Sequence, residues 1–246
     1  MKRARIVVFA SGTKTGGGSG FEKLVEASRT GVLEADIVAV VSQHARGGVH
    51  ERAVRLGVTF VLLSMPSSGY YLPDPYGAMT RAFHADYSFL SGWTLRARGL
   101  NPRTTINIHS APLPGFGGRD WYGIKVHERM LAAYRKREIW KTAVSMHFVT
   151  EEYDAGPVFF KQEIDIKDDD TAHTLAARVN VVEHRFQTRV SNLVVTGQIT
   201  WDGVNPTSLR VPSGYLICRP VMFVEDERLI LPPVVRVGNM FYVTVR

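Results

Sequence analysis

Short apolar segments rich in β-branched residues alternate with amphipathic segments through the first two thirds of the chain. Runs that are apolar throughout suit a parallel sheet buried on both faces, and helices between them supply the crossovers that parallel strands need. The strand-like runs occupy residues 5–11, 36–42, 58–63, 86–92 and 104–110, and the helical segments between them occupy 20–31, 49–57 and 74–85. The sequence therefore predicts an α/β fold with a doubly wound, mostly parallel sheet, and a ligand at the carboxyl ends of its strands.

The pattern changes towards the C-terminus. Four more elements are expected, namely a helix over 124–138, strands over 141–149 and 156–166, and a long helix over 171–195. Gly197 can end that helix. Beyond it, strand-like runs are interrupted by proline and show no helical period. We therefore predict a domain over residues 1–196 and a β-rich C-terminal extension over 197–246.

Basic residues outnumber acidic ones by 30 to 23, which gives a formal net charge of +7 and a pI of about 9.6. Such a surplus attracts nucleic acid, and equally a phosphorylated or polycarboxylate small molecule. The basic residues are scattered and do not interleave repeatedly with aromatic ones. A small anionic ligand is therefore favoured over nucleic acid.

The composition also bears on location. No apolar run approaches the roughly 18 residues that span a bilayer, so no membrane partner is expected. Residues 1–12 combine basic residues with a short apolar run, but no small-x-small cleavage pattern follows, and we interpret the run as a strand. Cys218 is the single cysteine. This excludes an intrachain disulfide and favours a reducing, cytoplasmic setting.

A glycine-rich loop, "SGTKTGGGSGFEKL", follows the first expected strand. Gly12 and Gly17 have the spacing of a phosphate-binding P-loop, but the lysine of that motif is missing, and so is the GxGxxG spacing of dinucleotide sites. Glycines let a backbone approach a ligand closely, and the amides at a helix N-terminus favour an anion. We predict a phosphate seat at Gly18, Ser19 and Gly20, with a merely flexible turn as the alternative.

An amide and an imidazole end the strand over 104–110. Asn107 and His109 lie two residues apart and share one face of the strand, whereas Ile106 and Ile108 face apolar packing. A buried histidine can simply be satisfied by a hydrogen bond. At the carboxyl end of a sheet strand, however, Asn can donate to a developing oxyanion and His can transfer protons near neutral pH.

Two later segments carry further candidates. "SMHFVTEEYDAGP" places His147 on a strand and then presents Glu151, Glu152 and Asp154 in a turn. A turn aspartate often bonds only to its own backbone, and this reading stays open for Asp154. On the long helix, the segment "ARVNVVEHRF" carries Glu183 next to a histidine. In isolation, both would be expected to be surface residues.

Together these segments resemble one family, the phosphoribosylglycinamide formyltransferases, over about residues 5–193. The most specific parts are "NIHSAPLPGFGG" and "MHFVTEEYDAGP". The resemblance implies a Rossmann-like formyltransferase fold and transfer of a formyl group from 10-formyltetrahydrofolate to glycinamide ribonucleotide in purine biosynthesis. It implies that Asn107, His109 and Asp154 are catalytic, and that Glu183 joins the phosphate seat in substrate binding.

The implied folate site is made by two segments, with Trp93, Thr94, Leu95, Arg96, His147, Thr150, Glu151 and Glu152. The chain departs from the family in three places. The phosphate loop is longer and reads Gly18-Ser19-Gly20, the proline that commonly follows the catalytic histidine is Ser110, and Leu95 stands where an arginine is usual, with Arg96 displaced by one residue.

By this resemblance, Asn107 and a protonated His109 stabilise the tetrahedral oxyanion, and Asp154 raises the proton affinity of His109. No metal is expected, since the histidines lack ligand-like spacing. The partners are small molecules, a phosphorylated ribosyl amine and a folate, bound by a monomer or homodimer. Two alternatives stay open, a sugar-nucleotide N-formyltransferase with the same triad and a non-catalytic phosphate- or RNA-binding module.

Overall fold

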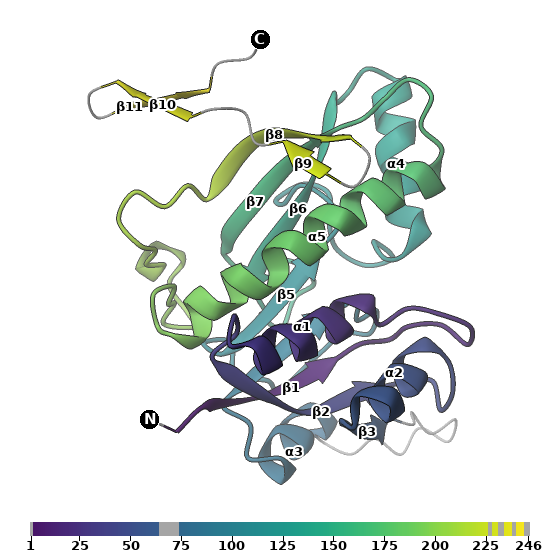
Figure 1. Cartoon of the computed structure of the whole chain (residues 1–246), viewed down its shortest axis with the longest axis vertical. Coiled ribbons are helices and arrows are strands. Elements are labelled where there is room, and N and C mark those ends of the chain that lie inside the picture. Colours follow the sequence, from purple (N-terminus) through teal and green to yellow (C-terminus); the bar gives the residue numbers. More distant parts are fainter. Residues whose placement is uncertain (1, 64–73, 226–227, 231–233, 238–239, 244–246) are drawn as a thin grey trace.

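A nine-stranded sheet forms the centre of the computed structural model, which describes residues 2–63, 74–225, 228–230, 234–237 and 240–243 (Figure 1). The strand order is β3-β2-β1-β4-β5-β6-β7-β8-β9, and the first five strands are mutually parallel. β6 is antiparallel to both β5 and β7. The order reverses direction at β1, as in doubly wound folds, which confirms the predicted fold class.

The elements follow the sequence pattern closely. The strands of the main sheet are β1 (Ala4–Phe9), β2 (Ala35–Ser42), β3 (Thr59–Leu62), β4 (Tyr87–Ser91), β5 (Thr105–His109), β6 (Lys141–Phe148), β7 (Val158–Asp165), β8 (Cys218–Glu225) and β9 (Arg228–Ile230). The helices are α1 (Ser19–Thr30), α2 (Gly48–Leu56), α3 (Pro75–Ala82), α4 (Ile124–Arg135), α5 (Ala172–Val195) and the short 3-10 helix η1 (Pro206–Ser208). A separate two-stranded sheet pairs β10 (Val234–Val237) with β11 (Met240–Val243).

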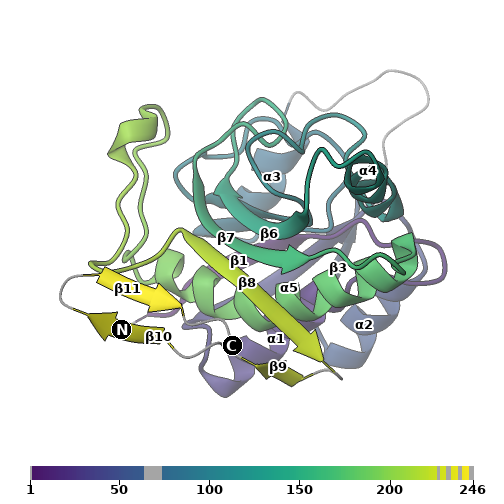
Figure 2. The same cartoon turned by 90° about the horizontal axis from the view of Figure 1, so that it is seen from above.

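Alternating residues of β1 explain why both faces of the sheet are covered. Ile6 and Val8 pack into the larger core with residues of α1, α2, α4 and α5. Val7 and Phe9 point the other way into a smaller core that contains Tyr76 of α3. Figure 2 shows α1, α2 and α5 on one side of the sheet and α3 on the other. A strand buried on both faces is therefore apolar throughout.

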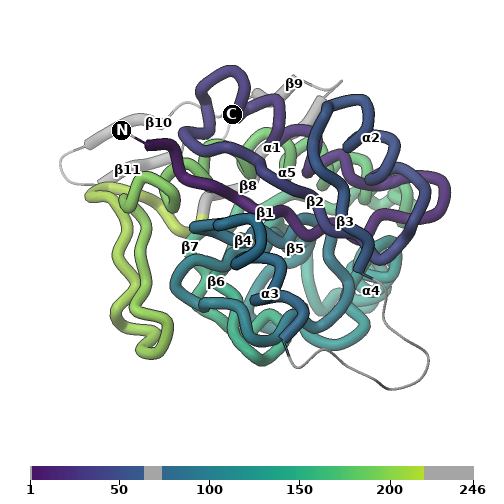
Figure 3. The backbone as a smooth tube through the Cα atoms, turned by 90° about the horizontal axis from the view of Figure 1, so that it is seen from below, coloured from purple at the N-terminus to yellow at the C-terminus, as the bar shows by residue number. Residues whose placement is uncertain are grey.

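The segment after α5 returns to the main body before it adds strands. Ile199 and Trp201 are buried in the larger core, where the Trp201 ring lies 5.7 Å from that of Phe148. Residues 202–208 then project as an arm that carries η1 (Figure 3), and Leu209, Val211 and Tyr215 pack back against the larger core. β8 pairs in parallel with β7. The division at residue 197 stays a prediction, and the extension shares both core and sheet with the preceding segment.

The long helix α5 is held in place by the buried residues along one of its faces, which pack against the rest of the protein. Its N-terminus is closed by a capping box between Thr171 and Thr174, and its buried residues face β6 and β7. Among the residues that the structure describes, no helix is both long and apolar enough to cross a bilayer.

Candidate active site

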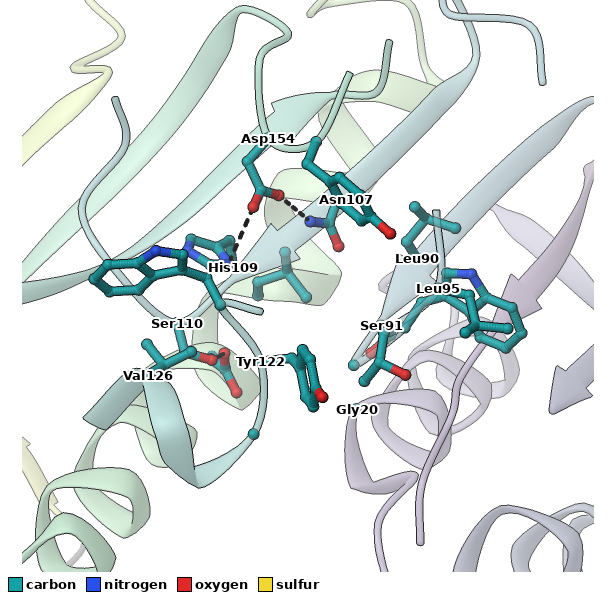
Figure 4. Close-up of a pocket in the computed structure, with 18 of the residues that line it drawn as sticks. Gly20, Leu90, Ser91, Leu95, Asn107, His109, Ser110, Tyr122, Val126 and Asp154 are labelled. Atoms are coloured by element: carbon teal, nitrogen blue, oxygen red, sulfur yellow. Dashed lines mark hydrogen bonds and ion pairs between the residues drawn. The ribbon is translucent and has the colours of Figure 1, made fainter. Parts of the chain in front are cut away.

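A pocket of about 550 Å³ opens at the carboxyl ends of β1, β4 and β5 (Figure 4). Its walls are the loop after β1, the segment after β4, the end of β5, the start of α4, the turn after β6 and one face of α5. This volume lies within the usual range of small-ligand sites. All fifteen residues that the sequence indicated lie on its lining, from the glycine loop to the turn after β6.

Asp154 is the hub of the polar contacts in this pocket. Its Oδ2 accepts a hydrogen bond from the Gly118 amide at 2.8 Å and lies 4.0 Å from His109 Nδ1. Its Oδ1 lies 3.3 Å from Asn107 Nδ2. Burial raises the pKa of this carboxyl, but His147, His109 and the Gly118 amide together bring the pKa below its usual value. Asp154 is therefore ionised at neutral pH and bonds well beyond its own turn.

His109 is 6% exposed at the end of β5. Its Nε2 lies 2.7 Å from the Phe116 carbonyl oxygen. A carbonyl only accepts, so Nε2 carries the hydrogen and Nδ1, beside Asp154, is the free base. Burial lowers the pKa of His109 below its ordinary value, although Asp154 and Phe116 oppose this. The lowered pKa favours a neutral imidazole at neutral pH, whose Nδ1 can take up a proton.

Asn107 connects Asp154 to a second histidine. Its Nδ2 lies 3.1 Å from His147 Nε2, and His147 Nδ1 lies 2.7 Å from the Phe148 carbonyl oxygen. The Phe148 contact assigns the hydrogen to Nδ1, so Nε2 accepts from Asn107. His147 is 1% exposed. His147 Nε2 also lies 3.4 Å from Asp154 Oδ1, so this buried histidine contacts both Asn107 and Asp154.

Glu183 on α5 faces the same pocket from the side opposite Asp154. Ser110 Oγ donates to its Oε1 at 2.6 Å, and Asn180 Nδ2 lies 3.3 Å from its Oε2. Burial raises the pKa of Glu183, while the two hydrogen bonds oppose that rise. The adjacent His184 faces elsewhere, towards the charged residues of α1.

The predicted phosphate seat lies where the glycine loop enters α1. Gly18 is the N-cap residue in the left-handed region, at φ 84°, and no side chain caps the helix there. The first-turn amides of α1 are thus free of a side-chain cap, which is the arrangement that binds anions. Gly20 has a different reason to be glycine, because a Cβ there would lie 2.3 Å from Ser91 Oγ.

The segment after β4 and the turn after β6 are joined at the other end of the pocket. Arg96 Nε donates to the Glu151 carbonyl at 2.7 Å, and Arg96 Nη2 pairs with Glu152 at 2.6 Å. Thr94 bonds to Ser11 through its hydroxyl and its amide. The Trp93 ring packs edge-on against Phe9, and Leu95 and Thr150 complete this wall.

Sequence reasoning missed several contributors to the site, among them Asn180, Gly118, Phe116 and His127. Gly118 and Phe116 act through backbone atoms, which carry no signal in residue type. His127 on α4 is 6% exposed and lines the pocket, and its buried Nδ1 has no hydrogen-bond partner among the described residues. Its helical spacing resembles that of an ordinary core position. Within the described part of the chain, no group of three or more His, Cys, Asp or Glu could hold a metal ion.

The chain matches a family of known proteins over most of its length. The family described as "Formyl transferase" matches residues 4–191. The chloroplastic phosphoribosylglycinamide formyltransferase of Vigna unguiculata is 31% identical over 212 residues, which are 83% of this chain and 65% of that protein. The chain thus spans slightly less than two thirds of that relative.

Solved structures agree with the sequence match. The crystal structure of phosphoribosylglycinamide formyltransferase from Brucella melitensis is 31% identical, with a TM-score of 0.63 over 78% of this chain and 96% of that one. Glycinamide ribonucleotide transformylase 1 from Symbiobacterium toebii is 24% identical and shares the fold, with a TM-score of 0.70 over 85% and 94% of the two chains.

Proposed function

Because this chain belongs to the formyl transferase family, we propose that it transfers a formyl group from 10-formyltetrahydrofolate to the amine of glycinamide ribonucleotide, a step of purine biosynthesis. The observation that carries this proposal is the joint contact of Asp154 with His109 and Asn107 at the carboxyl edge of the sheet. The relatives named above bear the name of this activity. A metal has no part in the proposed reaction.

The proposed reaction begins when the acceptor amine attacks the formyl carbon carried by the folate nitrogen. A carbon–nitrogen bond forms, and the formyl oxygen takes up the electron pair. His109 Nδ1 accepts the proton that the amine loses, and ionised Asp154 stabilises the resulting imidazolium. Collapse of the oxyanion breaks the bond to the folate nitrogen, which receives the proton.

Asn107 has a more constrained role in this proposal than its residue type indicates. Its amide nitrogen is engaged by both His147 and Asp154, at 3.1 and 3.3 Å. To donate to an oxyanion, the amide must give up one of these contacts. Preorganised donors stabilise developing charge best when they need little rearrangement. We propose that protonation of His109 draws Asp154 towards the imidazolium and frees one N–H of Asn107.

The two substrates occupy opposite ends of the pocket in this proposal. The phosphate of the acceptor lies on the first-turn amides of α1, at Gly18, Ser19 and Gly20, and Glu183 contacts its ribose. The folate lies against Trp93 to Arg96 and the turn Thr150 to Glu152. The surplus of basic residues suits both substrates, since each carries negative charge.

We further propose that the chain acts in the cytoplasm as a monomer or homodimer, with residues 1–196 as the formyltransferase domain. The single cysteine supports a reducing compartment. The Vigna unguiculata relative is named as chloroplastic, which is a property of that protein. Fractionation and light scattering of the native protein test location and oligomeric state.

The deciding experiment supplies the purified chain with 10-formyltetrahydrofolate and either glycinamide ribonucleotide or an amino-sugar nucleotide. Formation of the formylated ribonucleotide, followed by mass spectrometry, is the expected result. Formylation of the amino sugar alone would assign the chain to the sugar-nucleotide enzymes. Salt-sensitive RNA binding without any transfer would leave a binding module instead.

A further inference from the structure

Ser110 connects the reacting end of the pocket to its acceptor end. It directly follows His109, the last residue of β5, at a bend in the chain. His109 faces Asp154, and Ser110 faces α5, where its hydroxyl donates to Glu183 Oε1 at 2.6 Å. Figure 4 shows Ser110 beyond His109 and away from Asp154. One short segment therefore positions two carboxylates on opposite walls.

The lone pairs of Glu183 indicate what it can still bind. An ionised carboxylate has about four acceptor positions, two on each oxygen. Ser110 occupies one on Oε1, and Asn180 occupies one on Oε2. Among the described residues nothing else bonds to these oxygens, so one position on each stays open, and all three residues line the pocket. Two neighbouring hydroxyl groups present two donors side by side, which matches this pair of acceptors.

The contact also favours the form of Glu183 that only accepts hydrogen bonds. Burial raises the pKa of Glu183, and the Ser110 and Asn180 contacts limit this rise. The 2.6 Å separation is typical of a charge-assisted bond between a hydroxyl and a carboxylate. Without the hydroxyl, the carboxyl would be free to rotate and to protonate, and a protonated carboxyl donates at one of its two oxygens.

We propose that Ser110 is a positioning residue that fixes the Glu183 carboxylate with one open acceptor on each oxygen, and thereby selects an acceptor substrate with a vicinal diol. This inference rests on the proposed function for the identity of the acceptor. It assigns a role to a residue at which the chain departs from the usual proline of the family it resembles.

The first test compares two probes, ribose 5-phosphate and 2-deoxyribose 5-phosphate, by calorimetric titration. The wild-type protein should prefer the ribose probe, because only that probe carries the diol. Ser110→Ala should reduce this preference about tenfold, as expected for a lost charge-assisted hydrogen bond. An unchanged preference in Ser110→Ala would overturn the inference. Because no transfer is needed, this result stands whether or not the proposed reaction is correct.

The second test uses turnover. Ser110→Ala should raise the KM for glycinamide ribonucleotide about tenfold and leave kcat and the KM for the folate within about twofold. A wild-type protein that formylates no ribonucleotide would refute the proposed function alone. Equal changes in both KM values would refute the role of Ser110, since general damage to the pocket affects both substrates.

Matched variants separate this role from packing. Ser110→Thr and Ser110→Val have nearly the same size, and only the threonine keeps the hydroxyl, so only Ser110→Thr should retain the ribose preference. If both variants lose it equally, the hydroxyl is not the cause. Ser28→Ala is the control, because the buried Ser28 donates an equally short bond, 2.6 Å to Ala35, on the far side of α1. It should lower the melting temperature and leave both KM values unchanged.

Discussion

Two of the acidic side chains in the turn after β6, Glu152 and Asp154, lie in opposite environments. The Asp154 side chain is 12% exposed and contacts His109, Asn107 and the Gly118 amide. The Glu152 side chain is 73% exposed and pairs with Arg96. Both are carboxylates with a basic partner within 4.0 Å. The two carboxylates therefore differ in how deeply they are buried, and not in their chemical group or in having a basic partner.

The difference shows where charge affects chemistry in this pocket. Asp154 is largely shielded from water, so a change in one charge alters the protonation of its neighbours. Around Glu152 water screens the pair, and exposed ion pairs contribute about 0–1 kcal/mol. The buried end is therefore expected to control catalysis and the exposed end to hold a loop in place. Four measurements test this contrast.

The largest effect is expected for Asp154→Asn. Asparagine tolerates the positive φ of 51° at this position and still accepts the Gly118 hydrogen bond, but it carries no charge. Turnover should fall about 10³-fold. Loss of the anion also lowers the pKa of His109 further, so the acidic limb of the pH–rate profile should move to lower pH. A pH–rate series with saturating substrates measures both. Near-normal turnover with an unchanged profile would make Asp154 a simple turn residue.

The second effect concerns the burial of His127, whose pKa falls from 6.5 to about 4, mainly through burial and then through repulsion by His109. The folded pKa lies below the unfolded one, so the stability is present above pH 6.5 and is lost as the pH falls towards 4. Between pH 7 and 4.5 this loss is roughly 2.5 kcal/mol in the free energy of unfolding.

Urea unfolding at both pH values tests this expectation. His127→Gln should show a pH dependence smaller by that amount than the wild-type protein. His173→Gln is the control, because that histidine is exposed at the start of α5. If both variants keep the wild-type dependence, burial of His127 does not limit acid stability.

The third effect concerns the acceptor end of the pocket, where backbone amides rather than side chains are proposed to bind the substrate. In Gly18→Val, the new Cβ would lie 2.9 Å from Val49 at a φ that disfavours side chains. The KM for the phosphorylated acceptor should rise about tenfold, with a smaller change for the folate. Gly31→Val is the matched control, since it has a similar φ of 80° but open space and lies at the other end of α1. Equal effects on both substrates would indicate general damage to the loop.

The smallest effect is expected for Glu152→Gln. Arg96 keeps its bond to the Glu151 carbonyl, so the loop stays joined. The KM for the folate should change less than about twofold, in keeping with an exposed ion pair. Steady-state kinetics against the folate measure it. A tenfold change would show that Glu152 binds substrate directly, and the contrast with Asp154 would fail.

The sequence predicted the sheet well because its signals are local. Apolar continuity in the first strands and helical spacing between them appear within windows of about ten residues, so the expected elements differ from the observed ones by only a few residues at each end. The roles of Asn107 and His109 could likewise be predicted from the sequence, because the two residues share one face of a strand at its carboxyl end.

The protonation states of the site residues could not be predicted from such local sequence signals. Burial favours the neutral form of His109, and the Phe116 carbonyl sets which ring nitrogen carries the hydrogen; residue types encode neither effect. The bond between Ser110 and Glu183 joins residues 73 positions apart, and only the packing of α5 against the end of β5 brings them together. Long-range contacts of this kind follow from the folded chain as a whole.

Pairing of β8 with β7 has a consequence for how this chain can be divided. An edge strand with free N–H and C=O groups can pair with a strand of another chain, and proteins usually cover such an edge. A chain cut at residue 196 would leave β7 as an uncovered edge strand. It would also remove Trp201 from Phe148, whose carbonyl holds His147. The composition changes at residue 197, but the extension pairs with β7 and so covers that edge of the sheet that carries the active site.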